Sequence, residues 1–452
     1  MSETQILNDF VKAYAETPEL AIKWMFYVGD IREGLGERRL FRILLKYVIS
    51  QYKHLIQYIG EYNRFDSLFE LFDTDAEKDM IEFVKKQLKE DLVAANNNKS
   101  CSLLAKWMPS ANTSSKSTVA KAHKLMTALG MRPVQYRKML SKLRKHINIV
   151  EAQMCAQKWT DINYEQVPSK ANILYKNAFL KHDEARRREF LGKLSSGEVK
   201  INAGAVFPHD IIHKYTSDQG SRWDCRATRK DETLEGMWKA LPNTVDPTKP
   251  VIVVRDGSGS MSSTISGTNV TALEVATALT IYFSERTNKA FANKFITFSS
   301  RSELIDMTNC KSLFDKINLC AAHDDCSNTN VKAVFDQILS IAVKNHVEQS
   351  EIPTILIVSD MEFDSATGRT ANQTLFGRIA SDYAQHGYKL PKLVFWNVMN
   401  RSGAIPVQQN KLGVALVSGF SQNTCKMIMS NKLDPFEALK DVLLSKRYEV
   451  IK

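Results

Sequence analysis

The chain has 452 residues, 44% hydrophobic and 25% charged, a balance that excludes a disordered protein and predicts two or three domains. No run of 18 apolar residues occurs, and the acidic start MSETQILNDF does not resemble a secretory signal. Seven scattered cysteines without a C-x-x-C pair favour buried thiols in a reducing compartment. We therefore expect a cytoplasmic protein, monomeric and not bound to a membrane.

The net charge of +11 is concentrated in one part of the chain. Residues 101–200 hold 19 Lys or Arg against 7 Asp or Glu, and residues 101–150 hold ten basic residues and no acid. Because like charges repel and weaken a fold, this concentration predicts a polyanionic partner. The alternative is a solvated helical surface without a partner.

The first half of the chain has a helical pattern, with apolar residues at spacings of three and four. Successive short helices predict a solenoid of helical pairs, which could curve into an arc or a ring. The predicted helices are residues 4–15, 18–29, 36–51, 52–60, 64–72, 75–94, 100–107, 117–129, 133–145, 149–157, 170–181, 183–194 and 231–240.

A proline-rich segment, Leu241 to Pro250, separates this pattern from a different one and predicts two domains, residues 1–248 and 249–452. In the second domain, apolar strands alternate with amphipathic helices, which predicts a doubly wound, mainly parallel sheet that binds ligands beyond the carboxyl ends of its strands. The predicted strands are 251–254, 294–298, 354–358, 392–398 and 413–417, and the predicted helices are 271–285, 329–343, 370–385, 421–429 and 435–445.

Hydroxyl and carboxylate side chains follow two of these strands. Asp256, Ser258 and Ser260 lie in the loop DGSGSM after the first strand, and Asp360 directly follows the strand 354–358 and Ser359. Oxygen ligands with little formal charge suit a hard cation, Mg²⁺ first, with Mn²⁺ or Ca²⁺ as alternatives. A serine–glycine turn without a metal is the other interpretation.

The D-x-S-x-S motif with a later strand-terminal Asp resembles the metal-ion-dependent adhesion site of von Willebrand factor A domains. This resemblance implies a von Willebrand A domain whose metal ligands are Asp256, Ser258, Ser260, Thr329 and Asp360. It also implies one coordination position open to a carboxylate of an acidic protein partner. Arg255 departs from the family pattern, because that strand position is usually apolar.

Other motifs give little support for an enzyme. Cys320, His323 and Cys326 offer three soft ligands, but a structural zinc needs a fourth. The Gly34-Leu35-Gly36 segment lacks the G-K-[ST] of a phosphate loop, which favours a turn between helices. A metal-dependent nuclease would need more carboxylates than Asp256 and Asp360. We therefore expect no catalytic residues.

Basic residues alternate with apolar ones at helical spacing between residues 116 and 145, and a second cluster lies at 186–188. Tyr136, His123 and His146 lie among them and could stack on unpaired bases or pack in the core. The residues predicted to bind RNA are Lys116, Lys121, His123, Lys124, Arg132, Arg137, Lys138, Lys142, Arg144, Lys145, Arg186 and Arg187.

The whole layout resembles the Ro ribonucleoprotein and its TROVE-domain relatives, and several segments are similar to a related family known in phages, bacteria and plants. These segments include residues 27–39, 105–109, 136–146, 167–171, 358–364 and 394–397. The resemblance implies HEAT-like helical repeats followed by the von Willebrand A domain. It further implies a scaffold that binds small non-coding RNA, or RNA with single-stranded ends. The alternative is a metal-dependent protein adaptor or a virion component without a primary RNA role.

Overall fold

The computed structural model describes residues 2–217, 225–246, 248–265, 268–287, 289–299, 301–324, 331–360, 369–399, 414–418 and 435–452. Contacts divide the chain into two compact units. The first unit contains Met1–Val167, Lys181–Glu184 and Leu443–Lys452, and the second contains Pro168–Leu180 and Ala185–Val442. The domain boundary between residues 248 and 249 stays a prediction, since it marks a change of element type and not a limit of either compact unit.

The first unit is helical over its described residues, as the spacing predicts. Its α-helices are α1 (Glu3–Glu16), α2 (Pro18–Gly29), α3 (Arg38–Gln51), α4 (Ile59–Tyr62), α5 (Glu77–Asn96), α6 (Leu104–Trp107), α7 (Lys116–Ala128), α8 (Pro133–His146) and α9 (Val150–Cys155). Short 3-10 helices span Lys53–Tyr58, Phe65–Glu70 and Trp159–Asp161. The Gly34-Leu35-Gly36 segment forms the predicted turn between α2 and α3.

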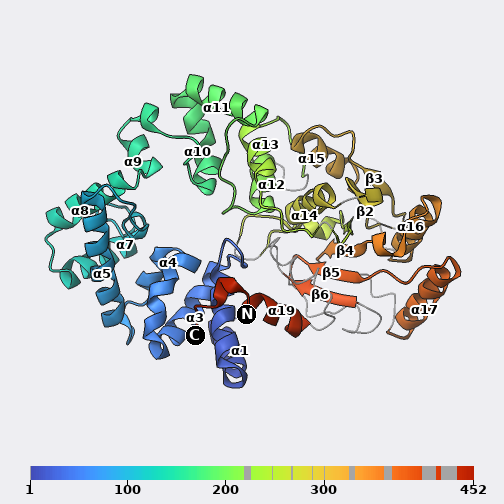
Figure 1. The fold of residues 1–452 in the computed structure, drawn as a ribbon, viewed down its shortest axis with the longest axis horizontal. Helices are drawn as coiled ribbons and strands as arrows, with labels where there is room; N and C mark the ends of the chain where they lie inside the picture. Colours follow the sequence, from blue (N-terminus) through green and yellow to red (C-terminus); the bar gives the residue numbers. More distant parts are fainter. Residues whose placement is uncertain are drawn as a thin grey trace. The chain divides into compact units, whose positions relative to one another are not determined.

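Helices α7 and α8 follow one another in the chain, and the local sequence fixes the turn between them. The Ser115 hydroxyl accepts a hydrogen bond from the Thr118 amide at 3.3 Å and begins α7. Gly130, at φ +64°, ends α7, and Pro133 begins α8. Their buried faces carry apolar side chains, and Figure 1 shows α8 beside α5. Apart from Lys121 and Arg144, the Lys and Arg side chains of the two helices are exposed.

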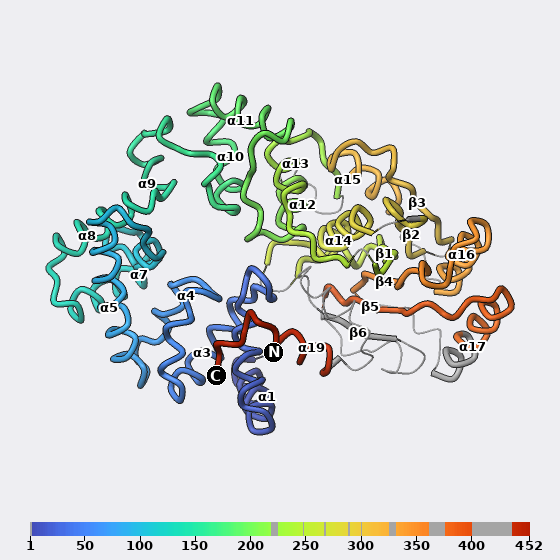
Figure 2. The backbone as a smooth tube through the Cα atoms, in the orientation of Figure 1, coloured from blue at the N-terminus to red at the C-terminus, as the bar shows by residue number. Residues whose placement is uncertain are grey.

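The last residues of the chain belong to the first unit. The Tyr62 hydroxyl donates to the Arg447 carbonyl at 2.6 Å, and Arg447 Nε donates to Asp30 Oδ2 at 2.9 Å. Ile451 is fully buried, and Figure 2 shows the C-terminal residues beside the N-terminal helices. The chain thus returns to its first helices after the sheet, which the sequence pattern does not predict.

The second unit contains a six-stranded sheet in the order β3-β2-β1-β4-β5-β6, parallel except for the β2/β3 pair. The strands are β1 (Val251–Arg255), β2 (Lys294–Thr297), β3 (Leu304–Asp306), β4 (Thr354–Ser359), β5 (Leu393–Asn397) and β6 (Val414–Ser418). This confirms the predicted doubly wound sheet, to which the structure adds the short edge strand β3.

The helices of this unit include two that periodicity does not predict, α12 and α15. Those entirely within it are α12 (Pro208–Thr216), α13 (Glu232–Lys239), α14 (Ala272–Arg286), α15 (Leu313–Ala322), α16 (Val331–Lys344) and α17 (Arg369–Gln385). Helices α10 (Ser169–His182) and α11 (Glu184–Ser196) belong to it except at residues 181–184, and α19 (Pro435–Leu443) except at its last residue. The helix predicted at 421–429 lies outside the described residues.

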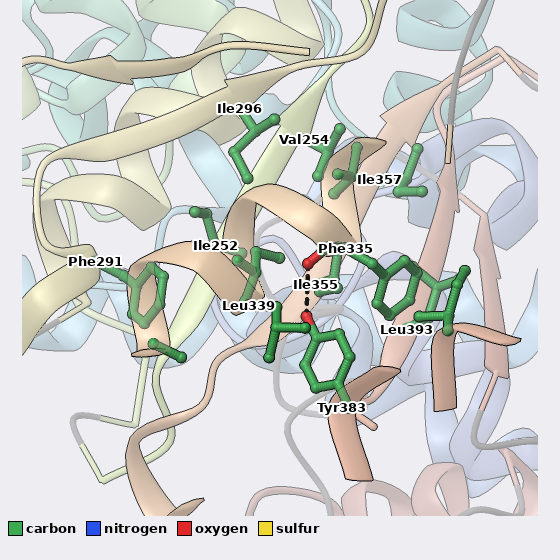
Figure 3. Close-up of a cluster of buried hydrophobic side chains, with 14 of the residues drawn as sticks. Ile252, Val254, Phe291, Ile296, Phe335, Leu339, Ile355, Ile357, Tyr383 and Leu393 are labelled. Atoms are coloured by element: carbon green, nitrogen blue, oxygen red, sulfur yellow. Dashed lines mark hydrogen bonds between the residues drawn. The ribbon is translucent and has the colours of Figure 1, made fainter. Parts of the chain in front are cut away.

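Strand β1 is buried along its whole length, as expected for a central parallel strand covered on both sides. Ile252 and Val254 join a hydrophobic cluster with Phe335 of α16 and Tyr383 of α17, whose hydroxyl donates to the Phe335 carbonyl at 2.8 Å (Figure 3). Alternation of side chains along the strand directs Arg255 to the opposite face, toward α14. In the described part of the chain, no helix is both long and apolar enough to span a bilayer.

Candidate metal site and basic surface

The carboxyl ends of β1 and β4 bring the predicted metal-binding residues into one place. The two strands pair in parallel with Arg255 opposite Val358, and the Asp256 amide donates to the Val358 carbonyl at 3.2 Å. Asp256 Oδ2 accepts from the Ser359 hydroxyl at 2.6 Å, and Asp360 follows directly. The register of the two strands therefore places both carboxylate-bearing residues at one edge of the sheet.

The loop after β1 folds back on Asp256 and aligns its two hydroxyls. Asp256 Oδ1 accepts from the Ser258 amide at 2.9 Å, and the Ser258 and Ser260 hydroxyl oxygens lie 3.1 Å apart. Ser258 and Ser260 are partly exposed, whereas Asp256 and Asp360 are each 2% exposed. The Ser258 and Ser260 side chains are thus partly accessible to solvent, whereas the Asp256 carboxylate is buried.

Negative charge gathers at this edge of the sheet. Burial raises the pKa of Asp256 and the charge of Asp360 raises it further, while hydrogen bonds from Ser359 and Ser258 oppose the shift. Among the described residues, no Lys or Arg forms an ion pair with Asp256. A bound cation would compensate this charge, so the donor set and its electrostatics fit a hard divalent metal.

Arg255, the departure from the expected apolar pattern, has a structural role on the other face of β1. Its guanidinium is 1% exposed and donates to Thr277 Oγ1 of α14 at 3.0 and 3.2 Å. It also donates to Asp324 Oδ1 at 2.5 Å and to the Cys320 carbonyl at 3.2 Å. The buried charge is paired and hydrogen-bonded, which is the condition for tolerating it in a core.

Thr329 and Cys326 lie outside the described residues, so the fifth predicted ligand stays a prediction. Cys320 is buried at the end of α15, and burial raises the pKa of its thiol to about 12. The described residues contain no group of three or more His, Cys, Asp or Glu arranged to hold a metal. Ser359 was not among the predicted site residues, although its position directly before Asp360 at the end of a strand is a sequence signal.

Most of the basic residues predicted from the sequence lie on α7 and α8 or directly before α8. Apart from Lys121 and Arg144, which are partly buried, they are exposed. We define the basic surface as Lys116, Lys121, His123, Lys124, Arg132, Arg137, Lys138, Lys142 and Lys145. Lys121 pairs with Glu70 at 3.1 Å and Lys124 pairs with Asp73. Within the described part of the chain, the other Lys and Arg of this surface form no ion pairs.

Arg144, which was predicted to bind RNA, is held by contacts within the protein, as are two rings for which base stacking and core packing were both open, Tyr136 and His146. Arg144 donates to the carbonyls of Ala105 and Met108 and to the Ser110 hydroxyl at 2.8–2.9 Å. Tyr136 is fully buried, and its hydroxyl donates to a backbone carbonyl. The imidazole of His146 lies 2.7 Å from the Lys99 carbonyl. Arg144 and Tyr136 therefore connect α8 to residues 105–110.

The second cluster differs from the expectation at one residue. Arg187 is fully buried, donates to Thr233 Oγ1 at 3.2 Å and lies 5.2 Å from the ring centroids of Phe179 and Phe190. The prediction that Arg187 contacts RNA is therefore wrong. Helical spacing alone did not show that Arg187 lies on the buried face of α11. Arg186 is partly exposed.

The protein thus has a helical first unit and, in its second unit, a mainly parallel sheet with an Asp-x-Ser-x-Ser loop. The chain matches the models of two domains of unknown function, DUF2828 over residues 65–247 and DUF7788 over residues 250–447. It is 27% identical over 486 residues to the uncharacterized protein L728 of Acanthamoeba polyphaga mimivirus, covering 97% of this chain and 82% of that protein.

Among solved structures, the Ro (RSR) protein of Deinococcus radiodurans aligns with 96% of this chain and 92% of its own, at 12% identity and a TM-score of 0.43. A similarity of this size supports no conclusion about function, so the residues of this chain carry the proposals below.

Proposed function

We propose that the chain is an RNA-binding scaffold whose basic surface on α7 and α8 contacts the phosphate backbone. The observation that carries this proposal is the exposure of these Lys and Arg side chains, most of them without a carboxylate partner in the described part of the chain. RNA is the polyanion whose phosphates release counterions when such side chains bind them. Small non-coding RNAs, or RNAs with a single-stranded end, suit a surface of two helices.

The role proposed for the loop after β1 is binding of one divalent cation, Mg²⁺ in the first place. Asp256, Ser258, Ser260 and Asp360 would hold it, with Thr329 as the further predicted ligand. The donors are oxygens, as Mg²⁺ prefers, and two of them are buried carboxylates that a cation would neutralise. The metal would supply a point of attachment for an acidic group or a local stabilisation, without a reaction.

Charge reversal on α8 tests the proposed RNA surface. Arg137, Lys138 and Lys145 are exposed and unpaired among the described residues, so changing all three to Glu should preserve the fold. We expect affinity for a structured RNA with a single-stranded 3′ tail to fall by at least about tenfold at constant salt. The measurement is fluorescence anisotropy with protein stripped of nucleic acid.

The matched control changes Lys85, Lys86 and Lys89 of α5 to Glu, which alters the net charge equally at exposed positions of the same unit. Its affinity should stay within about threefold of the unchanged protein if α7 and α8 form the binding surface. Equal losses in both variants would show a nonspecific charge effect. Absence of RNA binding by the unchanged protein at low salt would reject the proposal.

A further inference from the structure

A second group of cationic side chains lies in the first unit, outside the basic surface. Arg38 and Arg42 are four residues apart on α3, which places them on one face of that helix. Arg42 pairs with Asp66 at 2.9 Å, and Asp66 also pairs with Arg64. We define the arginine cluster as Arg38, Arg42 and Arg64.

The arginine cluster is connected to the basic surface through one carboxylate. Glu70 Oε1 forms an ion pair with Lys121 Nζ of α7 at 3.1 Å and lies 3.9 Å from Arg42 Nη1. The side chains of Arg42, Glu70 and Lys121 are 31%, 25% and 36% exposed. An extended polyanion could therefore contact both groups.

The acids near the cluster do not neutralise it. Asp66 and Glu70 are shared among Arg42, Arg64 and Lys121, and Arg38 has no ion-pair partner among the described residues. Burial and the neighbouring charges of Arg64 and Arg42 lower the pKa of Arg38, although Asp66 and Glu37 act in the opposite direction. Excess positive charge therefore remains, and an anion would relieve it.

An aromatic side chain orients part of the cluster. The guanidinium carbon of Arg64 lies 4.2 Å from the ring centroid of Trp107, and Lys106 Nζ lies 5.6 Å from the same centroid. A cation held over an indole face is stabilised and loses little further freedom when it binds a ligand. Trp107 therefore holds Arg64 in place, and Lys106 adds another cation.

We propose that the arginine cluster is a second phosphate-contact site for the RNA that the basic surface binds. This inference rests on the RNA binding proposed above and names the path that the backbone of the RNA follows, from α7 toward α3. Guanidinium groups suit phosphate, since their paired N–H donors match its oxygens. Lys121 lies at the junction of the two contact regions.

Arg38 offers a test with a control beside it. Arg39 is the next residue of α3, is also exposed, and points about 100° away from Arg38 around the helix. We expect Arg38→Glu to weaken RNA affinity about tenfold and to reduce the slope of affinity against salt by about one, with Arg39→Glu within about threefold of the unchanged protein. Arg38→Lys, which retains the charge, should restore most of the affinity.

Anisotropy titrations of the full chain with the same tailed RNA distinguish the outcomes, with thermal unfolding as a check on each variant and Arg38→Gln as a milder substitute. Equal affinities for the Arg38 and Arg39 variants would overturn the second contact site. If the α8 charge-reversal variant still lost binding in that case, the proposed function would stand. Failure of the unchanged protein to bind RNA would overturn both.

Discussion

At the scale of single residues, two buried charged residues at the end of β1 differ in role, one structural and one proposed to bind a cation. Arg255 and Asp256 are neighbours in sequence and both are buried, but they lie on opposite sides of the strand end. Arg255 has its counter-charge in Asp324, whereas Asp256 lies near a second carboxylate, Asp360. The first arrangement stabilises the fold, and the second is suited to a cation.

Removing one of the two carboxylates should abolish the response to metal. With Asp256→Asn, we expect no Mg²⁺-induced rise in thermal stability, whereas the unchanged protein should gain about 2.7 kcal/mol at a Mg²⁺ concentration of 100 times Kd. Asp336→Asn, at an exposed carboxylate of α16, is the control and should respond fully. RNA affinity should change little, because the basic surface lies on the other unit. An undiminished Mg²⁺ response in Asp256→Asn would exclude this site.

The contact between His213 of α12 and Glu274 of α14 should make stability depend on pH. The hydrogen bond to Glu274, 3.0 Å from His213 Nδ1, raises the pKa of His213. Burial raises the pKa of Glu274, but hydrogen bonds from His213 and Thr216 outweigh it, so that pKa is lowered. The stabilisation by His213 is complete below its ordinary pKa of about 6.5 and is lost as pH rises through the raised value.

The stabilisation by Glu274 is present above its ordinary pKa and is lost as pH falls through the lowered value. Between about pH 5 and 6, His213→Gln should therefore reduce stability most, by about 1 kcal/mol, and the difference should shrink as pH rises through the raised pKa of His213. Thermal unfolding of both proteins across pH measures it. A difference that is constant with pH would contradict the ionic contribution.

At the scale of helices and strands, the periodicity of apolar residues predicts the long elements well and fails for the short ones. The apolar spacing predicts α1, α2, α5, α7 and α8 to within about two residues at each end, because each buries a repeating face. The short strand β3 and helices α12 and α15 were missed, since their contacts come from distant residues. The same limit applies to Arg187, whose burial depends on Thr233 and Asn172.

The C-terminal segment also depends on distant contacts, and its removal should loosen the first helices. Arg447 neutralises Asp30, which is fully buried and also accepts from the Tyr448 hydroxyl at 3.1 Å. Arg447→Met leaves that carboxylate without its ion pair and should reduce protection of the α2 amides by about 3 kcal/mol. Tyr448→Phe removes one hydrogen bond and should cost about 1 kcal/mol.

Native-state hydrogen exchange measures these local free energies. Lys446→Met is the matched control, because Lys446 is exposed beside Arg447, and it should leave exchange in α2 unchanged. Equal exchange in the Arg447 and Lys446 variants would show that the Arg447–Asp30 ion pair does not stabilise α2.

The whole molecule divides its charge between parts with different proposed roles. The excess of Lys and Arg lies in residues 101–200, while the proposed metal loop lies in the second unit. Composition predicted the region where the exposed basic residues lie, and the motif named Asp256, Ser258, Ser260 and Asp360, which the structure places at one edge of the sheet. The sequence motif could not identify Ser359 as a hydrogen-bond partner of Asp256, because that contact arises from the pairing of β1 with β4.

The salt dependence of RNA affinity tests the central claim most directly. Each phosphate contact of a single strand contributes about 0.7 to the slope of log affinity against log salt. The unchanged protein should show a steep slope, and changing Arg137, Lys138 and Lys145 to Glu should reduce it by about two along with the affinity. A slope and affinity that are the same in both proteins would contradict RNA binding by α7 and α8.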